Sequence, residues 1–130
     1  AMNQMMSGNT FLYYGDELGM KGSGEDPNKR CAMQWSSDET ADGMCVGPNA
    51  SPVAMKYGSL EEQAENPYSI YNFTKHTIKL RNQYPIIARG LATYENAYSD
   101  ENVCVIKKTY EGEEMVLVFN ISTISPFFKM

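Results

Sequence analysis

Two adjacent acids, Asp16 and Glu17, are the residues of this chain whose types first suggest catalysis. A pair of carboxylates can act as general acid and general base when both side chains flank one bond of a substrate. Side chains of adjacent residues diverge and seldom face the same bond. Acids in a turn more often accept hydrogen bonds from nearby backbone amides. We therefore expect one of these acids to bind amides of the turn and the other to be solvated.

Metal chemistry has weaker support in the sequence. Asp38, Glu39 and Asp42 lie close enough together to suggest calcium, but their spacing matches no calcium-binding loop. His76 is the only histidine and falls inside a helical pattern, which argues against a zinc site. We expect no metal and no cofactor, and treat the three acids as a solvated stretch.

Charge and cysteine content narrow the class of protein further. The chain has 130 residues, a net charge of −5 and a pI near 4.8, and its Lys and Arg residues form no cluster. This argues against nucleic acids and anionic membranes as partners. The odd number of cysteines predicts no disulfide framework, so free thiols are favoured, while a bond between Cys31 and Cys45 stays open. No apolar run approaches the roughly 18 residues of a membrane span, and the first residues do not resemble a signal peptide. We expect a soluble protein and leave its localisation open.

An apolar segment at residues 10–14 precedes most of these polar residues. Phe11 to Tyr14 leave no polar face, which predicts a strand buried on both sides, as in a parallel sheet. Ligands of such sheets bind outside the carboxyl ends of the strands. The Gly-, Ser- and Asp-rich loop from Gly15 to about residue 58 should therefore face any ligand.

Helix and strand signals follow in the rest of the chain. Residues 1–7 read as the end of a helix, and Ser59-x-x-Glu62 predicts a short helix that begins near Leu60. A longer helix is expected from Asn66-Pro67 to about Gln83. Segments 91–95, 103–110 and 115–121 read as strands, with a hairpin at 111–114.

The quoted residues resemble a known family. Phe11-Leu-Tyr-Tyr-Gly-Asp-Glu-Leu-Gly-Met20, followed by Asp26-Pro-Asn-Lys-Arg-Cys-Ala-Met-Gln-Trp35, resembles the alpha-amylase family (glycoside hydrolase family 13) in its eighth barrel strand and following loop. Asn66-Pro-Tyr-Ser-Ile-Tyr-Asn-Phe-Thr-Lys-His-Thr-Ile-Lys-Leu-Arg81 resembles the eighth barrel helix. The resemblance implies that residues 1–86 are the C-terminal end of a TIM-barrel catalytic domain. Residues 87–130 would then begin an antiparallel C-terminal β domain.

For the isolated chain we expect an α+β fold in which the long helix packs on the antiparallel strands. Strand 10–14 would be completed by a hairpin partner or, through self-association, by a second copy of the chain. Unpaired strand edges that expose apolar residues favour such association.

The resemblance also implies a function for the parent protein. Members of the family hydrolyse alpha-glucosidic bonds in starch or oligosaccharides with retention, using carboxylates carried by earlier barrel strands. The motifs that hold them, with Arg-x-Asp and His-Asp pairs, are absent here. We therefore predict a fragment without catalytic residues that is inactive alone. The alternatives are a stand-alone glycan- or protein-binding or assembly module without catalysis, or a remnant without function.

Three residues of the loop are candidates for contacting substrate. The resemblance places Arg30 near the non-reducing-end sugar, with Asp26 as its ion-pair partner. A guanidinium suits this role because its planar fork can bind a carboxylate and donate to sugar hydroxyls together. Trp35 could stack on a sugar ring, as could Tyr13 or Tyr14. The alternatives are a surface salt bridge that holds the loop and a packed tryptophan.

Overall fold

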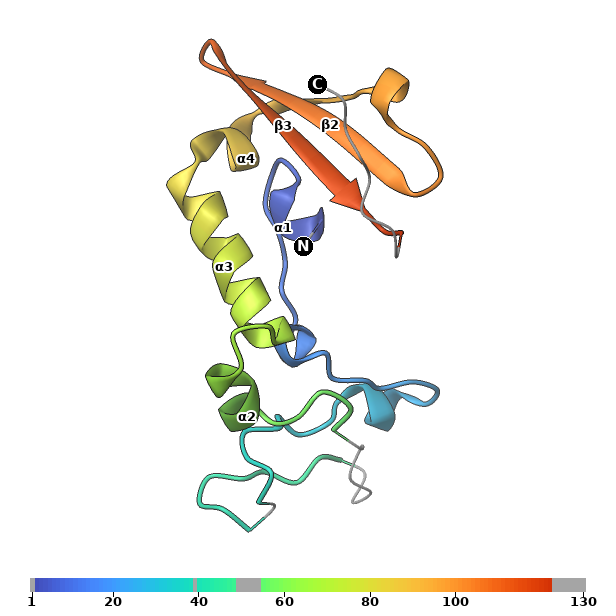
Figure 1. Cartoon of the computed structure of the whole chain (residues 1–130). Helices are drawn as coiled ribbons and strands as arrows, with labels where there is room; N and C mark the ends of the chain where they lie inside the picture. Colours follow the sequence, from blue (N-terminus) through green and yellow to red (C-terminus); the bar gives the residue numbers. More distant parts are fainter. Residues whose placement is uncertain (1, 39, 49–54, 123–130) are drawn as a thin grey trace. The chain divides into compact units, whose positions relative to one another are not determined.

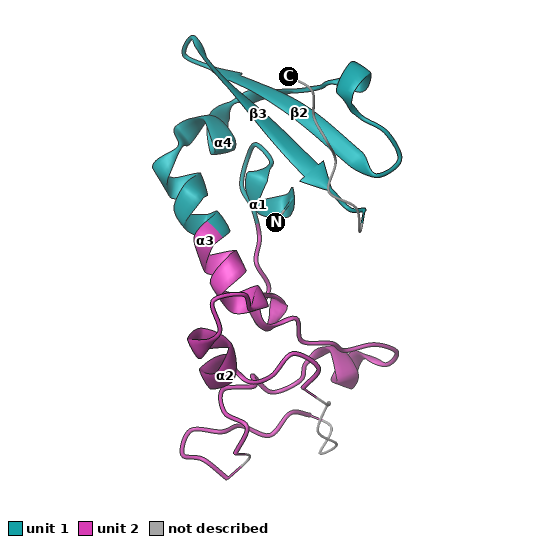
Figure 2. Cartoon of the chain, in the orientation of Figure 1, with its two compact units in different colours: residues 1–10, 77–130 teal, residues 11–76 magenta. Residues whose placement is uncertain are grey.

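A computed structural model of the chain describes residues 2–38, 40–48 and 55–122. The polypeptide divides into two compact units (Figure 2). Unit 1 combines residues 1–10 with 77–130, and unit 2 is the continuous segment 11–76. Helix α3, Ile70–Gln83, contributes its first half to unit 2 and its second half to unit 1. No helix in the described part of the chain is both long and apolar enough to cross a membrane.

Unit 1 contains a sheet of three antiparallel strands in the order β1-β2-β3 (Figure 1). The strands are β1 Leu91–Tyr94, β2 Val103–Tyr110 and β3 Glu113–Asn120, and a short 3₁₀ turn, Asn96–Tyr98, follows β1. Glu111 and Gly112 connect β2 to β3 with φ values of 50° and 86°. Positive φ at both central residues is the geometry of a type I′ hairpin, whose twist matches that of the strands. The expected strands and hairpin are confirmed.

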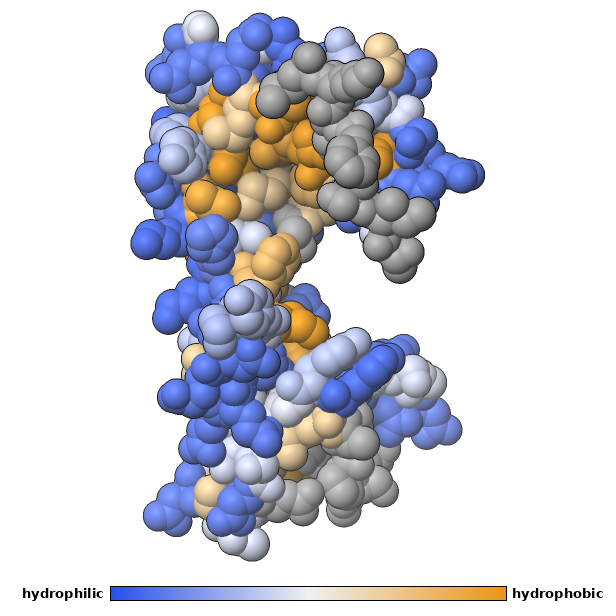
Figure 3. Space-filling view, in the orientation of Figure 1, coloured by the Kyte–Doolittle hydropathy of each residue, from blue (hydrophilic) through white to orange (hydrophobic). Residues whose placement is uncertain are grey.

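The core of unit 1 lies between one face of this sheet and two short helices. Met5 of α1 (Met2–Met5) and Ile86 and Ile87 of α4 (Pro85–Arg89) form its buried centre. Alternate residues of β3 point to the same face, so Met115, Leu117 and Phe119 all pack there. Figure 3 shows apolar residues gathered in this unit, with hydrophilic residues around them.

Helix α4 was not expected from the sequence, although Pro85 at its start is a standard helix-initiating residue. It packs on β2 and β3, whereas α3 adds only Leu80 to the core cluster. The expected packing of a long helix on the strands is therefore achieved mainly by α4. The N-terminal helix is also shorter than expected and ends before Gly8, whose φ is 89°.

Two cations hold the N-terminal segment within unit 1. The Arg81 guanidinium donates to the carbonyls of Gln4 (2.9 Å) and Met6 (2.7 Å), and also to the carbonyl of Gly8. The Lys108 ammonium donates to the Ser7 hydroxyl at 3.1 Å and to the Ile87 carbonyl. Residues 2–8 are thus tied to parts of the chain far away in sequence.

Unit 2 is built from short helices joined by loops. It contains the 3₁₀ turns η1 (Asp16–Leu18) and η2 (Asp26–Lys29) and the helix α2 (Leu60–Glu65). Buried Gln63 links these parts, because its amide donates to the carbonyls of Leu18 (2.9 Å) and Gly58 (3.1 Å). Its carbonyl accepts from the amide of Tyr71 at 3.1 Å. One polar side chain therefore joins η1, the loop before α2 and the start of α3.

The predicted capping box of α2 is confirmed. The Ser59 hydroxyl accepts from the Glu62 amide at 3.3 Å, and the Glu62 carboxylate accepts from the Ser59 amide at 2.8 Å. The Glu62 carboxylate also accepts from the Ser59 hydroxyl, and the hydrogen bonds from the Ser59 amide and hydroxyl lower the pKa of Glu62. The sequence thus specified the start of this helix locally.

Two other expectations are wrong. Residues 11–13 join no strand, and Phe11 to Tyr14 are exposed, with 85% of Phe11 accessible. The described strands all belong to the antiparallel sheet of unit 1, and residues 11–13 are not among them. The longer helix begins at Ile70 instead of at Asn66-Pro67, since the Asn66 side chain caps a turn by accepting from the Tyr68 amide at 3.0 Å.

Candidate functional site

The turn after Tyr14 places the two adjacent acids. Gly15 adopts a φ of 89°, and the chain then enters η1. The Asp16 carboxylate accepts from the Tyr13 amide at 3.2 Å, and the Glu17 carboxylate accepts from the Gly15 amide at 2.9 Å. Both acids therefore bind local backbone, where one was expected to do so. These hydrogen bonds do not arrange the two carboxylates as a general acid and a general base for one bond.

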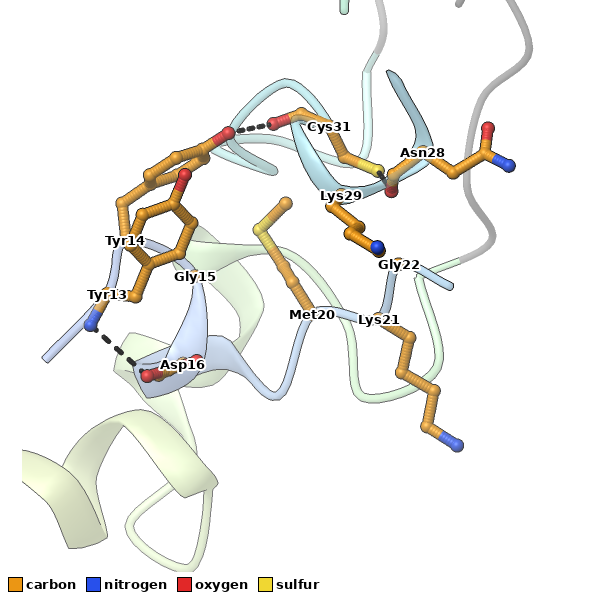
Figure 4. Close-up of a pocket in the computed structure, with 10 residues that line it drawn as sticks. All are labelled: Tyr13, Tyr14, Gly15, Asp16, Met20, Lys21, Gly22, Asn28, Lys29 and Cys31. Carbon is orange, nitrogen blue, oxygen red and sulfur yellow. Dashed lines mark hydrogen bonds between the residues drawn. The ribbon is translucent and has the colours of Figure 1, made fainter. Parts of the chain in front are cut away.

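A pocket of about 250 Å³ opens beside this turn (Figure 4). On one side the rings of Tyr13 and Tyr14 lie 4.8 Å apart between centroids and are inclined by 40°. The Tyr14 hydroxyl donates to the Cys31 carbonyl at 2.9 Å, which ties the turn to the segment that follows η2. The described residues that line it are Tyr13, Tyr14, Gly15, Asp16, Met20, Lys21, Gly22, Asn28, Lys29 and Cys31.

The described lining of the pocket combines aromatic, polar and cationic side chains with one acid. Among the described residues that line it, only Asp16 has a carboxylate, and that carboxylate accepts a hydrogen bond from the Tyr13 amide. A glycosidase site needs two carboxyl groups flanking the bond. Partial desolvation, followed by the neighbouring Tyr13, raises the pKa of Tyr14, so its hydroxyl stays protonated as a hydrogen-bond donor. In Figure 4 the Met20 side chain lies between the tyrosine pair and η2, whereas Lys21 extends away from them.

The structure brings Asp26 and Arg30 together. The Arg30 guanidinium lies 3.0 Å from the Asp26 carboxylate across one turn, and both side chains are more than half exposed. An exposed pair of this kind contributes about 0.2–1 kcal/mol. Neither residue lines the pocket, although Lys29 and Cys31, on either side of Arg30, do. Arg30 thus sits at the edge of the pocket with its side chain in solvent.

Trp35, the third candidate, is held through its backbone at the start of α2. Its side chain is 45% exposed and does not line the pocket. Its carbonyl accepts from the Glu61 amide at 3.1 Å, and the Gln34 carbonyl accepts from the Leu60 amide at 2.8 Å. These two carbonyls satisfy amides in the first turn of α2, which have no partner inside the helix. The backbone of Trp35 is therefore fixed, while its ring remains accessible.

The cysteines and the described acids Asp38 and Asp42 were the other candidates for chemistry. The thiols of Cys31, Cys45 and Cys104 are free, and the Cys31 thiol donates to the Asn28 carbonyl at 2.9 Å. Asp38 accepts from the Thr40 amide (2.9 Å) and hydroxyl (2.6 Å), which lowers its pKa. Glu39 lies outside the described residues. Within the described ranges no three His, Cys, Asp or Glu residues are grouped to hold a metal ion.

A second hollow was missed by sequence reasoning. It lies at the start of α3, measures about 480 Å³ and is lined by Pro67, Tyr68, Ser69, Ile70, Asn72, Phe73 and His76. Tyr68 follows a proline before the helix and lies outside its apolar stripe, which was the available signal for an exposed aromatic side chain.

Comparison with known proteins gives consistent matches. The family model described as "Alpha amylase, catalytic domain" matches residues 1–90. The chain is 29% identical to trehalose synthase of Thermus thermophilus over 96% of its own length, and 27% identical to oligo-1,6-glucosidase of Parageobacillus thermoglucosidasius over 97%. It spans only 14% and 29% of those proteins.

Solved structures agree with these sequence matches. Eubacterium rectale Amy13B superimposes with a TM-score of 0.87 and 54% identity over 93% of this chain, and 24% of Amy13B is covered. The alpha-amylase from H. orenii gives a TM-score of 0.74 and 25% identity over 92% of this chain, again covering 24% of the relative.

Proposed function

Because this chain belongs to the alpha-amylase family, we propose that it forms one side of the substrate site of a retaining alpha-glycosidase without supplying its catalytic acids. The observation that carries the proposal is the loop from Gly15 to Cys31. It combines a pocket flanked by two tyrosines with an exposed arginine at its edge. Asp16 and Glu17, the two acids of the turn beside the pocket, accept hydrogen bonds from backbone amides, and Asp26 pairs with Arg30, so we assign this loop a binding role.

The substrate that we propose is a neutral alpha-linked glucan or oligosaccharide. The names of the matched relatives include an oligo-1,6-glucosidase and alpha-amylases. A chain with a net charge of −5 has no general attraction for anionic ligands, and tyrosine rings suit the apolar faces of sugars.

Within this proposal Arg30 contacts the sugar at the non-reducing end. The Asp26 carboxylate pairs with one nitrogen of the Arg30 guanidinium, and the other N–H groups of the guanidinium remain to donate to sugar hydroxyls. Trp35, with a fixed backbone and an accessible ring, is the proposed stacking surface. Each of these side chains is already exposed, so binding requires no rearrangement of a packed core.

We also propose that residues 1–86 belong to the catalytic barrel and 87–130 to a C-terminal β domain. The family match, which stops at residue 90, and the first strand of the antiparallel sheet, which begins at Leu91, support a boundary near this point. The two compact units follow a different division, because residues 1–10 pack with the C-terminal half.

The role of Arg30 can be tested in a chimera. Residues 1–130 would replace the matching quarter of Eubacterium rectale Amy13B, and hydrolysis of maltoheptaose and isomaltose would be measured. We expect Arg30→Ala to raise KM about tenfold or more, since a lost charged hydrogen bond is worth about 1.5–3 kcal/mol. Lys79→Ala, an exposed cation on α3, is the control and should leave KM unchanged. An unchanged KM in Arg30→Ala would contradict the proposed contact.

The absence of catalytic acids has its own test. The purified 130-residue chain should release no reducing ends from maltoheptaose or isomaltose at high concentration. Turnover that disappears in Asp16→Asn or Glu17→Gln would overturn the proposal, because the acids that bind backbone would then be catalytic.

A further inference from the structure

The hollow at the start of α3, here called the Tyr68 groove, exposes aromatic rings without charge. Tyr68 is 94% exposed and Phe73 is 52% exposed. None of the seven lining residues is Lys, Arg, Asp or Glu. Its volume of about 480 Å³ falls within the range of small-ligand sites, roughly 300–1,000 Å³. The groove shares no lining residue with the pocket beside Tyr13 and Tyr14.

The backbone beneath the exposed rings is held by a dense set of hydrogen bonds. The Asn72 side-chain amide donates to the carbonyls of Gln63, Ala64 and Asn66 at 3.0, 3.0 and 2.9 Å. The Ser69 hydroxyl donates to the Gln63 carbonyl at 2.7 Å and accepts from the Asn72 amide at 3.1 Å. The turn that presents Tyr68 is therefore rigid, which reduces the entropy lost when a ligand binds.

These properties favour one kind of ligand. A phosphate or carboxylate would need a cation, and the lining has no lysine or arginine. A protein partner would need roughly 800 Å² on each side, far more than two rings and a histidine provide. A sugar needs an aromatic face for its C–H groups and a few polar atoms for its hydroxyls. Tyr68, Phe73 and His76 supply both.

We propose that the Tyr68 groove is a second glucan-binding site, separate from the site assigned to the loop around Arg30. The choice of an alpha-linked glucan as ligand rests on the proposed function, whereas the groove itself rests on exposure, rigidity and lack of charge. It would hold a polysaccharide chain on the protein surface and take no part in bond cleavage.

The experiment measures glucan binding by the purified 130-residue chain. Saturation-transfer NMR would detect binding of maltoheptaose, and affinity electrophoresis would detect binding of soluble starch. The variants are Tyr68→Ala, Phe73→Ala, Arg30→Ala and the control Tyr98→Ala, whose side chain is 66% exposed and outside the groove. Circular dichroism would verify that each variant is folded. Tyr68 is so exposed that its removal should not alter the fold.

We expect Tyr68→Ala and Phe73→Ala each to weaken binding about tenfold, as loss of an aromatic stacking contact would. Tyr98→Ala should have no effect. Binding that is lost in Arg30→Ala but retained in Tyr68→Ala and Phe73→Ala would overturn the groove and leave the proposed function intact. Absence of any binding by the wild-type chain would likewise contradict the proposed glucan site at the groove. The kinetics of Arg30→Ala in the Amy13B chimera would still decide the proposed function.

Discussion

At the scale of single residues, Lys108 has the most unusual environment. Its side chain is fully buried and its ammonium donates to the Ser7 hydroxyl and the Ile87 carbonyl. The ion pairs of the described residues involve other side chains, so no carboxylate compensates this charge there. Burial, and then the nearby Arg81, lowers the pKa of Lys108.

This environment predicts an alkaline gain in stability. Between its lowered pKa and the ordinary value of 10.5, Lys108 binds its proton more tightly in the unfolded chain than in the folded chain. The free energy of unfolding should therefore rise as pH rises through that window. In Lys108→Met this rise should be absent in urea denaturation at a series of pH values from 7 to 10.5.

The neighbouring lysine provides the control. Lys107 is paired with Glu114 at 2.6 Å, and that hydrogen bond and charge raise its pKa. Lys107→Met should retain the alkaline rise because Lys108 is still buried. Equal pH profiles for Lys108→Met and the wild type would show that the ammonium is not desolvated as described.

Residue-scale prediction from sequence succeeded where contacts are local. Asp16 and Glu17 were expected to serve the turn, although the sequence did not indicate that both would do so. Burial of Lys108 was missed, yet a signal existed. Adjacent residues of a strand face opposite sides, so one of Lys107 and Lys108 had to point toward the core. The role of the exposed Arg30 depends on a ligand, and no local pattern determines it.

At the scale of elements, the hairpin between β2 and β3 gives the sharpest prediction. Glu111 is the only described non-glycine residue with positive φ, and Gly112 follows it with φ 86°. Glu111→Asn should raise the free energy of unfolding by about 0.5–1 kcal/mol, because asparagine tolerates this conformation better. Gly112→Ala should lower it by about 1 kcal/mol or more for the opposite reason.

The measurement is thermal and urea unfolding of both variants. Gly90→Ala serves as a comparison. The φ of Gly90 is −64°, which other residues adopt, but an added Cβ would lie 2.4 Å from the Ile86 carbonyl oxygen. That variant should be destabilised by a steric clash and not by backbone conformation. A stable Gly112→Ala protein would exclude a type I′ turn in solution.

Elements defined by local signals were predicted well, and elements that need distant partners were not. The capping box at Ser59, the end of α3 at Gln83 and the strands of the sheet are as expected. The strand predicted at residues 10–14 is wrong because a strand exists only beside a hydrogen-bonded neighbour, and the composition of the segment does not supply one. The start of α3 shifted because Asn66 caps a turn of its own before the helix begins.

At the scale of the whole molecule, the exposed apolar segment from Phe11 to Tyr14 predicts self-association. Side chains of this size rarely lie exposed in a row on a monomer, and backbone outside a sheet can pair with another chain. Light scattering should show a mass that increases with concentration. Phe11→Ser should reduce the increase, and Val46→Ser, which alters an 83% exposed residue elsewhere, should not. A compact, monodisperse monomer at all concentrations would contradict the prediction.

The ties between the N-terminal segment and the rest of unit 1 also set an order of events during protein synthesis. The Arg81 hydrogen bonds span 73 to 77 residues, and the Lys108 hydrogen bond to Ser7 spans 101. Residues 2–8 therefore leave the ribosome long before their partners exist. Unit 2 is continuous in sequence and can form while translation proceeds. Residues 2–8 should therefore be among the last parts of unit 1 to become resistant to protease on a translating ribosome.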